Sequence, residues 1–110
     1  MGAYSPAPVI DKVLERKIIH KIVKPTLSAL KKKNNPYKGF LYVGLIIKNS
    51  EPYLIEFNVR MGDPECQVIL PRLKTDIVKI INDTINNKLN STKIKWDKKK
   101  SMTIVLCSKG

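Results

Sequence analysis

The chain has 110 residues, with 21 Lys and Arg against nine Asp and Glu, which gives a formal net charge of +12 at pH 7. Hydrophobic residues make up 43% of it, enough to build a core, and this excludes a disordered tail. No apolar run approaches the roughly 18 residues needed to span a bilayer. The first six residues also lack the basic and apolar regions of a secretion signal. These features predict a soluble, cytoplasmic protein.

The positive charge raises the question of nucleic-acid binding. The basic residues are nearly all Lys, and the chain is also rich in Ile and Asn, a joint bias that an AT-rich genome produces without selection for a ligand. The Lys runs 31–33 and 98–100 fall in expected loops, without the interleaved aromatic side chains on which bases stack. We therefore do not expect nucleic acid as the partner. A basic module that binds nucleic acid or phosphorylated partners remains the alternative function.

The first third of the chain is predicted to form an extended segment followed by a long helix. Residues 1–9 contain glycine and two prolines, which favour extended backbone. Asp11 is a candidate N-cap for a helix that runs to about Lys33, whose apolar residues recur every three and four positions. Pro25 should kink or split this helix, because proline cannot donate the helical hydrogen bond.

A β-hairpin is predicted next. Residues 39–47 and 53–58 are rich in β-forming side chains, and the polar segment 48–52 between them reads as a short turn. Strands joined by so short a turn should pair in antiparallel fashion. A second turn is expected at residues 62–64, where Gly-Asp-Pro supplies three turn-forming residues.

The last part of the chain is predicted to contain two helices and a strand. A short helix should end near Pro71, and a second should cover roughly 74–89, with isoleucines along one stripe. Residues 102–107 read as a final strand. The predicted fold class is therefore α+β, in which the strands from 39–58 and 102–107 form one antiparallel sheet and the helices pack on one face.

Residues 55–65 gather several polar and charged side chains and a glycine around one strand end. Successive strand residues point to opposite faces, so Glu56, Asn58 and Arg60 should share one face. The other face carries three apolar side chains and is expected to be core: Ile55, Phe57 and Val59. The polar face thus combines a carboxylate, an amide oxygen and a guanidinium.

These polar groups suit a metal ion and an anionic ligand. Mg²⁺ prefers oxygen ligands and usually keeps waters or takes phosphate oxygens, so Glu56 and Asn58 would leave positions open for a nucleoside triphosphate. Arg60 could hold a carboxylate or phosphoryl oxygen through its fork of donors. The same pattern is also compatible with an ordinary solvent-facing strand, and the residues alone leave that alternative open.

The longer string at residues 56–65 resembles the EFNxRxGDPE signature of the glycinamide ribonucleotide synthetase family, also called phosphoribosylamine–glycine ligases. Residues 1–8 resemble the GMGAYSPAP segment of this family, and residues 37–45 resemble its Y-x-GFLYxGL strand. The three motifs occur in the order that the family has, and together they cover nearly the whole chain.

This resemblance implies an ATP-grasp ligase of de novo purine synthesis, which joins glycine to 5-phosphoribosylamine through glycyl phosphate. By motif position, Glu56 and Asn58 would bind the Mg²⁺ or Mn²⁺ that bridges the phosphates of ATP. Arg60 would be the catalytic residue that contacts the substrate carboxylate or acyl phosphate. Gly62 and Asp63 would form the turn beside the substrate pocket.

The resemblance also implies domain boundaries. Residues 1–107 match the C-terminal portion of an ATP-grasp domain, and residues 108–110 match the truncated start of the family's C-terminal domain. The lobe that carries the phosphate-binding lysine precedes this region in the family. We therefore expect the isolated chain to be inactive, and a folded remnant without retained binding is a further alternative.

Overall fold

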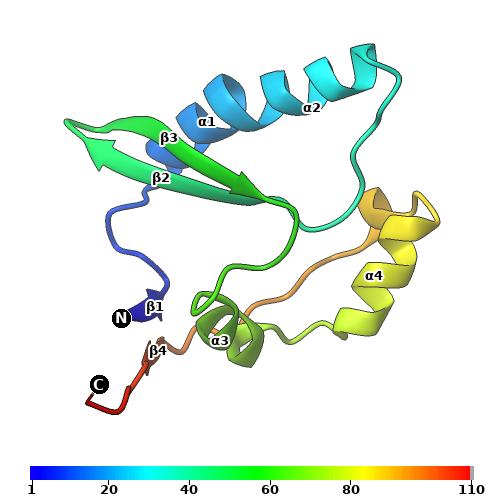
Figure 1. Cartoon of the computed structure of the whole chain (residues 1–110). Helices are drawn as coiled ribbons and strands as arrows, with labels where there is room; N and C mark the ends of the chain where they lie inside the picture. The colour runs from blue at the N-terminus through cyan, green and yellow to red at the C-terminus, as the bar shows by residue number, and fades with distance from the viewer. Residues whose placement is uncertain (110) are drawn as a thin grey trace. The chain divides into compact units, whose positions relative to one another are not determined.

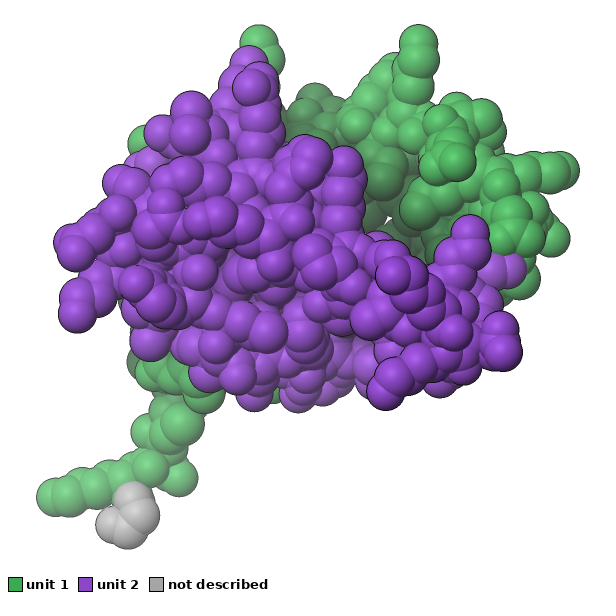
Figure 2. Space-filling model, turned by 90° about the horizontal axis from the view of Figure 1, so that it is seen from above, with its two compact units in different colours: residues 1–7, 61–110 green, residues 8–60 purple. Residues whose placement is uncertain are grey.

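The computed structural model describes residues 1–109. The chain folds as two compact units, which Figure 2 distinguishes by colour: unit 1 contains residues 1–7 and 61–110, and unit 2 contains residues 8–60. Within the described residues, no helix is both long enough and apolar enough to cross a membrane. Both units combine helices with a pair of antiparallel strands, so the predicted α+β class is confirmed.

Unit 2 begins with the long helix that the sequence predicts. Helix α1 spans Lys12–Ile18, and Asp11 caps it by accepting a hydrogen bond from the backbone N–H of Leu14 at 2.7 Å. This side-chain cap satisfies one of the backbone donors that a helix leaves unpaired at its first turn. The predicted N-cap is therefore confirmed.

The helix continues through an irregular turn. A π-helical turn covers Ile19–Val23, and helix α2 follows at Lys24–Lys32 with Pro25 in its first turn. In a π turn the backbone hydrogen bonds join residues five positions apart instead of four. Proline lacks the N–H that a regular helix requires at its position. The interruption predicted at the proline therefore takes the form of a π turn that ends two residues before it.

The predicted hairpin is confirmed. Strand β2 spans Tyr42–Lys48, and strand β3 spans Glu51–Asn58, its antiparallel partner. Between them, Asn49 and Ser50 have φ angles of 52° and 58°. Two successive positive φ angles are typical of the tight two-residue turn whose twist matches that of the flanking strands. The turn is thus shorter than predicted. Strand β2 begins three residues later than predicted and ends one residue later, and β3 begins two residues earlier.

The hairpin contains a β-bulge close to its open end. Gly44 pairs with Glu56, but the next residue of β2, Leu45, pairs with Leu54, so the register passes over Ile55. A bulge places two residues of one strand opposite one residue of the other and interrupts the alternation of side chains. Strand β3 therefore does not keep a single set of faces along its length.

For this reason the core face predicted for β3 is largely wrong. Ile55 is 61% exposed and Val59 is 75% exposed, whereas Phe57 is half-buried opposite Val43. Ile55 lies at the bulge, and Val59 lies beyond the end of the strand at Asn58. Only the central position of the three keeps the burial that the alternation predicts.

Helix α1 packs on the hairpin, as Figure 1 shows. Leu14 is its buried side chain, with 5% of its surface exposed. Lys17 and Lys21 both form ion pairs with Glu51 at the start of β3, and Lys17 also donates to the Ser50 carbonyl at 3.0 Å. The hydrogen bonds from Lys17 and then from Lys21 lower the pKa of Glu51 from 4.5 to about 2. The buried Leu14 and the two ion pairs with Glu51 thus hold the helix on the strands.

In unit 1 the two ends of the chain form a small sheet. Strand β1 (Gly2–Ser5) pairs with strand β4 (Ser101–Ile104) in antiparallel register. A Cβ atom at Gly2 would lie 2.6 Å from the carbonyl oxygen of Thr103, a distance that real Cβ atoms essentially never show. Glycine therefore permits the close approach of these two strands.

The prediction of a single sheet that joins 39–58 with 102–107 is wrong, because residues 1–109 contain two separate two-stranded sheets. The final strand finds its hydrogen-bond partners in residues 2–5, which the sequence analysis treated only as an extended segment. The strand also ends at Ile104 and does not reach residue 107.

A short helix covers this small sheet. Helix α3 spans Cys66–Ile69 and contacts both β1 and β4, and a 3₁₀ turn at Leu70–Arg72 follows it. Val68 on α3 is the most deeply buried of the described side chains, with 2% of its surface exposed. The prediction of a short helix that ends near Pro71 is confirmed.

The guanidinium of Arg72 connects separate parts of unit 1. It donates to the hydroxyl of Ser5 on β1, to the carbonyl of Asp97 at 3.1 Å and to the carbonyl of Lys99 at 2.9 Å. Arginine suits this position because its planar fork holds several donors in fixed directions. The polar segment before β4 is therefore held to the start of the chain by one side chain.

Helix α4 spans Ile77–Ile85, which is shorter than the predicted range of 74–89. Asp76 fixes its start, because the carboxylate accepts from the backbone N–H of Val78 at 2.7 Å. The predicted start of the helix, at residue 74, lies before this capping residue. The existence of the helix is confirmed, and its predicted ends are corrected.

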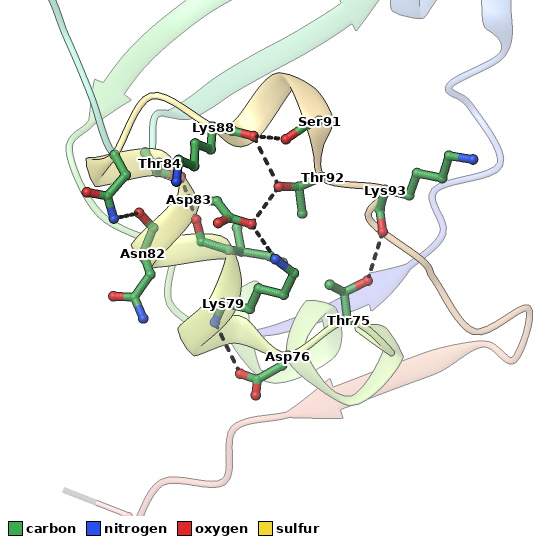
Figure 3. A network of polar contacts seen from close by, with 12 residues as sticks. Thr75, Asp76, Lys79, Asn82, Asp83, Thr84, Lys88, Ser91, Thr92 and Lys93 are labelled. Atoms are coloured by element: carbon green, nitrogen blue, oxygen red, sulfur yellow. Dashed lines mark hydrogen bonds and ion pairs between the residues drawn. The ribbon is translucent and has the colours of Figure 1, made fainter.

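A polar network joins α4 to the segment that follows it (Figure 3). Asp83 accepts hydrogen bonds from Lys79 at 2.8 Å and from Thr92 at 2.7 Å, and Thr75 donates to the carbonyl of Lys93 at 3.3 Å. The hydrogen bond from Lys79, followed by that from Thr92, lowers the pKa of Asp83 below its ordinary value. These contacts fix the polar segment 88–95 against a helix that has few buried side chains.

Candidate functional site

The candidate site lies on one face of the hairpin in unit 2, near the end of β3. Two cross-strand pairs form it: Tyr42 lies opposite Asn58, and Gly44 lies opposite Glu56. Residues directly opposite each other in an antiparallel pair project from the same face. Strand β3 therefore supplies a carboxylate and an amide to this face, and strand β2 supplies an aromatic ring and a position without a side chain.

The structure brings together the two residues predicted to bind metal. The Nδ2 atom of Asn58 donates a hydrogen bond to Oε1 of Glu56 at 2.8 Å. The side chain of Glu56 is exposed, and that of Asn58 is half-buried. The bulge at Ile55 does not separate them, because both residues lie on the same side of it in the chain. Their predicted common face is confirmed.

The oxygen atoms of this pair fit a hard divalent cation. Mg²⁺ and Mn²⁺ prefer carboxylate, carbonyl and water oxygens, and Mg²⁺ sites commonly use one or two carboxylates together with phosphate oxygens. In the part of the chain that the structure describes, no group of three or more His, Cys, Asp or Glu residues could hold a metal by itself. Glu56 and Asn58 thus fit a cation whose other ligands are water and phosphate.

Gly44 contributes to this site because it has no side chain, and it was not among the residues predicted from the sequence. A Cβ atom at this position would lie 3.0 Å from Cγ of Glu56 and 3.3 Å from Cε1 of Tyr42. The Cγ atom of Glu56 therefore occupies space beside Gly44 on the neighbouring strand that a side chain there would fill. The available signal was a glycine inside a strand pattern, which often marks a close approach.

Arg60 lies outside the strand. Strand β3 ends at Asn58, and Arg60 is exposed in the bend that follows. The alternation that was expected to place Arg60 on the same face as Glu56 and Asn58 therefore does not extend to it, and the shared face of Arg60 stays a prediction. The role of its guanidinium remains a separate prediction.

Gly62 and Asp63 form the predicted turn, which belongs to unit 1. The carbonyl of buried Gly62 accepts from the N–H of Cys66 at 2.9 Å, and the exposed carboxylate of Asp63 accepts from Nε2 of Gln67 at 3.2 Å. The Asp63–Pro64 peptide bond is cis. The turn therefore leads directly into α3, and its part in substrate binding remains a prediction.

A family model, "Phosphoribosylglycinamide synthetase, ATP-grasp (A) domain", matches residues 1–66, which is more than half of the chain and includes Glu56, Asn58 and Arg60. The chain therefore belongs to this family of ATP-grasp proteins. The family predicted from the three sequence motifs is confirmed.

Curated proteins resemble the chain over its whole length. It is 47% identical to the phosphoribosylamine–glycine ligase of Caldanaerobacter subterraneus and 44% identical to that of Agrobacterium fabrum. It is also 46% identical to the trifunctional purine biosynthetic protein adenosine-3 of Gallus gallus, of which it covers 11%. The chain covers 26% of each of the two bacterial ligases and so spans about a quarter of their length.

Proposed function

We propose that this chain is the metal- and substrate-binding portion of a phosphoribosylamine–glycine ligase, a carbon–nitrogen ligase of purine biosynthesis. The observation that carries the proposal is the Glu56–Asn58 pair, which lies within the match to the ATP-grasp family. Similarity over the whole chain to proteins that bear this name supports the choice of reaction. The alternative of a basic binding module finds no support among these relatives.

The proposed reaction has two steps. ATP transfers its terminal phosphoryl group to the carboxylate of glycine, which gives glycyl phosphate and ADP. The amine of 5-phosphoribosylamine then attacks the acyl carbon, and phosphate leaves as the amide bond of glycinamide ribonucleotide forms. Catalysis of phosphoryl transfer depends mainly on positioning and on neutralising charge. The chain therefore needs groups that hold oxygen atoms in place.

Each candidate residue has a part in this scheme. Glu56 and Asn58 would hold Mg²⁺ or Mn²⁺, and the bound cation would neutralise the phosphates of ATP. Arg60 would hold the carboxylate of glycine, and later an acyl phosphate oxygen, through paired N–H donors. Gly62 and Asp63 would shape the turn beside the substrate.

We assign residues 1–107 to the C-terminal portion of an ATP-grasp domain and place the start of a following domain at 108–110. Because the chain spans about a quarter of the related ligases, we expect some groups needed for the full reaction to lie outside these residues. The isolated chain should therefore not form glycinamide ribonucleotide at a measurable steady-state rate.

Binding of ATP with Mg²⁺, measured by calorimetry, tests the site in the chain itself. Glu56→Gln removes a ligand charge and should weaken binding at least about tenfold, in line with losses at metal sites. Glu15→Gln makes the same chemical change at an exposed position on α1 and should bind like the wild type. Equal affinity in the two variants would contradict the proposed metal site.

A chimeric ligase tests the reaction. The matching segment of the Caldanaerobacter ligase is replaced by this chain, and formation of glycinamide ribonucleotide is measured. The chimera should be active, and Glu56→Gln within it should lower kcat about 10²-fold or more, the scale on which transition-state charge stabilisation acts. A chimera that folds but forms no product, or one that tolerates Glu56→Gln, would count against the proposed function.

A further inference from the structure

We propose that Gly44 is a positioning residue for the carboxylate of Glu56. The inference rests on the proposed function, because it concerns the same cation site. Gly44 lies directly opposite Glu56, and a Cβ atom there would meet Cγ of Glu56 at 3.0 Å. Such a distance is shorter than ordinary van der Waals contact, so one of the two groups would have to move. The absence of a side chain at Gly44 therefore allows the observed position of Glu56.

The group that moves should be the side chain of Glu56 and not the backbone. Glu56 is exposed, and its stem can rotate into solvent. The backbone oxygen of Glu56 would lie 3.6 Å from the added Cβ, which is an ordinary contact distance. Gly44 is also not among the residues with positive φ, so alanine can adopt its backbone conformation. The hairpin should therefore fold with alanine at this position, and the carboxylate of Glu56 should leave its observed position.

On the side away from Glu56, the ring of Tyr42 lies next to Gly44. Cε1 of Tyr42 would lie 3.3 Å from the added Cβ, so a methyl group would fill the space between the tyrosine ring and the stem of Glu56. Glu56 would then swing away from the strand and lose its 2.8 Å hydrogen bond to Asn58. The side chains of Glu56 and Asn58 would no longer be held together. A cation would then find one ligand held in position instead of two.

Affinity and stability should therefore change independently. Glycine inside a strand lowers stability, because it adds no packing and loses much backbone freedom on folding. Gly44→Ala should accordingly leave the unfolding midpoint unchanged or raised. Loss of a group that orients a metal ligand commonly weakens metal binding 10- to 100-fold, and we expect a loss of about tenfold here. A glycine with a purely structural role would not produce this combination.

Titration of the ¹⁵N-labelled chain with Mn²⁺ tests the proposal. Paramagnetic broadening of the Asn58 side-chain amide signal reports binding at this site. Gly44→Ala should need about ten times more Mn²⁺ than the wild type for the same broadening. Ile46→Ala, an exposed change further along the same strand, should behave like the wild type. In a Glu56→Gln background, Gly44→Ala should cause no further weakening.

The Mn²⁺ titration separates the positioning role of Gly44 from the existence of the metal site. Equal broadening in the wild type and Gly44→Ala would overturn the positioning role and leave the metal site intact. Unfolding of the hairpin in Gly44→Ala would also overturn it, because the backbone and not Glu56 would then have yielded.

The absence of broadening in the wild type would refute the cation site itself. The positioning role would then be decided without metal, because nuclear Overhauser contacts between the Asn58 side-chain amide and the methylene groups of Glu56 should be present in the wild type and lost in Gly44→Ala. Unchanged contacts would overturn the proposal.

Discussion

Leu14→Ala should destabilise unit 2 more than any other truncation on helix α1. Leu14 is 5% exposed and is the buried side chain with which α1 packs on the hairpin. It also borders a cavity of about 400 Å³ that Val13 and Ile47 help to line. The packing between helix and strands therefore depends on a single well-buried leucine.

The size of the effect follows from the atoms that are removed. Leucine loses three carbon atoms on truncation to alanine, and about 0.8 kcal/mol for each buried methylene gives roughly 2.4 kcal/mol. Because Leu14 borders a pocket that is open to solvent, water can enter the space left by truncation, and the added penalty for an empty cavity should be small. We therefore expect a loss of about 2–3 kcal/mol, at the lower end of the range for such substitutions. This is a large fraction of the roughly 5–15 kcal/mol that stabilises a typical domain.

Urea denaturation followed by far-ultraviolet circular dichroism measures this loss. The midpoint should fall by about 1–2 M, given ordinary denaturant dependence for a chain of this size. Val13→Ala is the matched control, because Val13 is 62% exposed on the same helix and should change stability by less than about 0.5 kcal/mol. A loss below about 0.5 kcal/mol for Leu14→Ala, or equal losses for both variants, would refute the reasoning.

Two further variants test electrostatics and capping. Lys17 and Lys21 lower the pKa of Glu51 from 4.5 to about 2, so its stabilising effect is complete above about pH 4.5 and is lost as the pH falls towards 2. Thermal unfolding from pH 2 to 6 should show this loss, and Glu51→Gln should abolish it. Asp76→Ala should cost about 1 kcal/mol through loss of the α4 cap. Asn82→Ala, exposed on the same helix, should change thermal stability little, and equal losses would contradict the capping role.

Local sequence signals predicted the elements whose causes are local. Asp11 caps α1 within three residues of itself, and the two strands of the hairpin are separated by a turn of two residues. The pairing of β1 with β4 could not be predicted in this way, because nearly the whole chain separates them. Residues 2–5 include glycine, alanine and serine, which carry little β-propensity. Long-range hydrogen bonding decides their conformation.

The candidate site shows the same limit. The contact between Glu56 and Asn58 was predictable, because residues two apart on a strand share a face. The part played by Gly44 was not, since it depends on a register that a bulge at Ile55 shifts. The strand was predicted to end at Asn58, as it does, but the alternation was carried past this end to Arg60, which lies in the bend that follows.

The interleaving of the two units has a consequence for the order in which the chain folds during synthesis. Unit 2 is continuous in sequence, so its helix and hairpin can make all their mutual contacts once residue 60 is available. Strand β1 is synthesised before unit 2 but has its partner at residues 101–104, which follow unit 2. Contacts between distant residues form slowly, because a long loop must close first. Residues 2–5 are therefore expected to reach their final structure after unit 2.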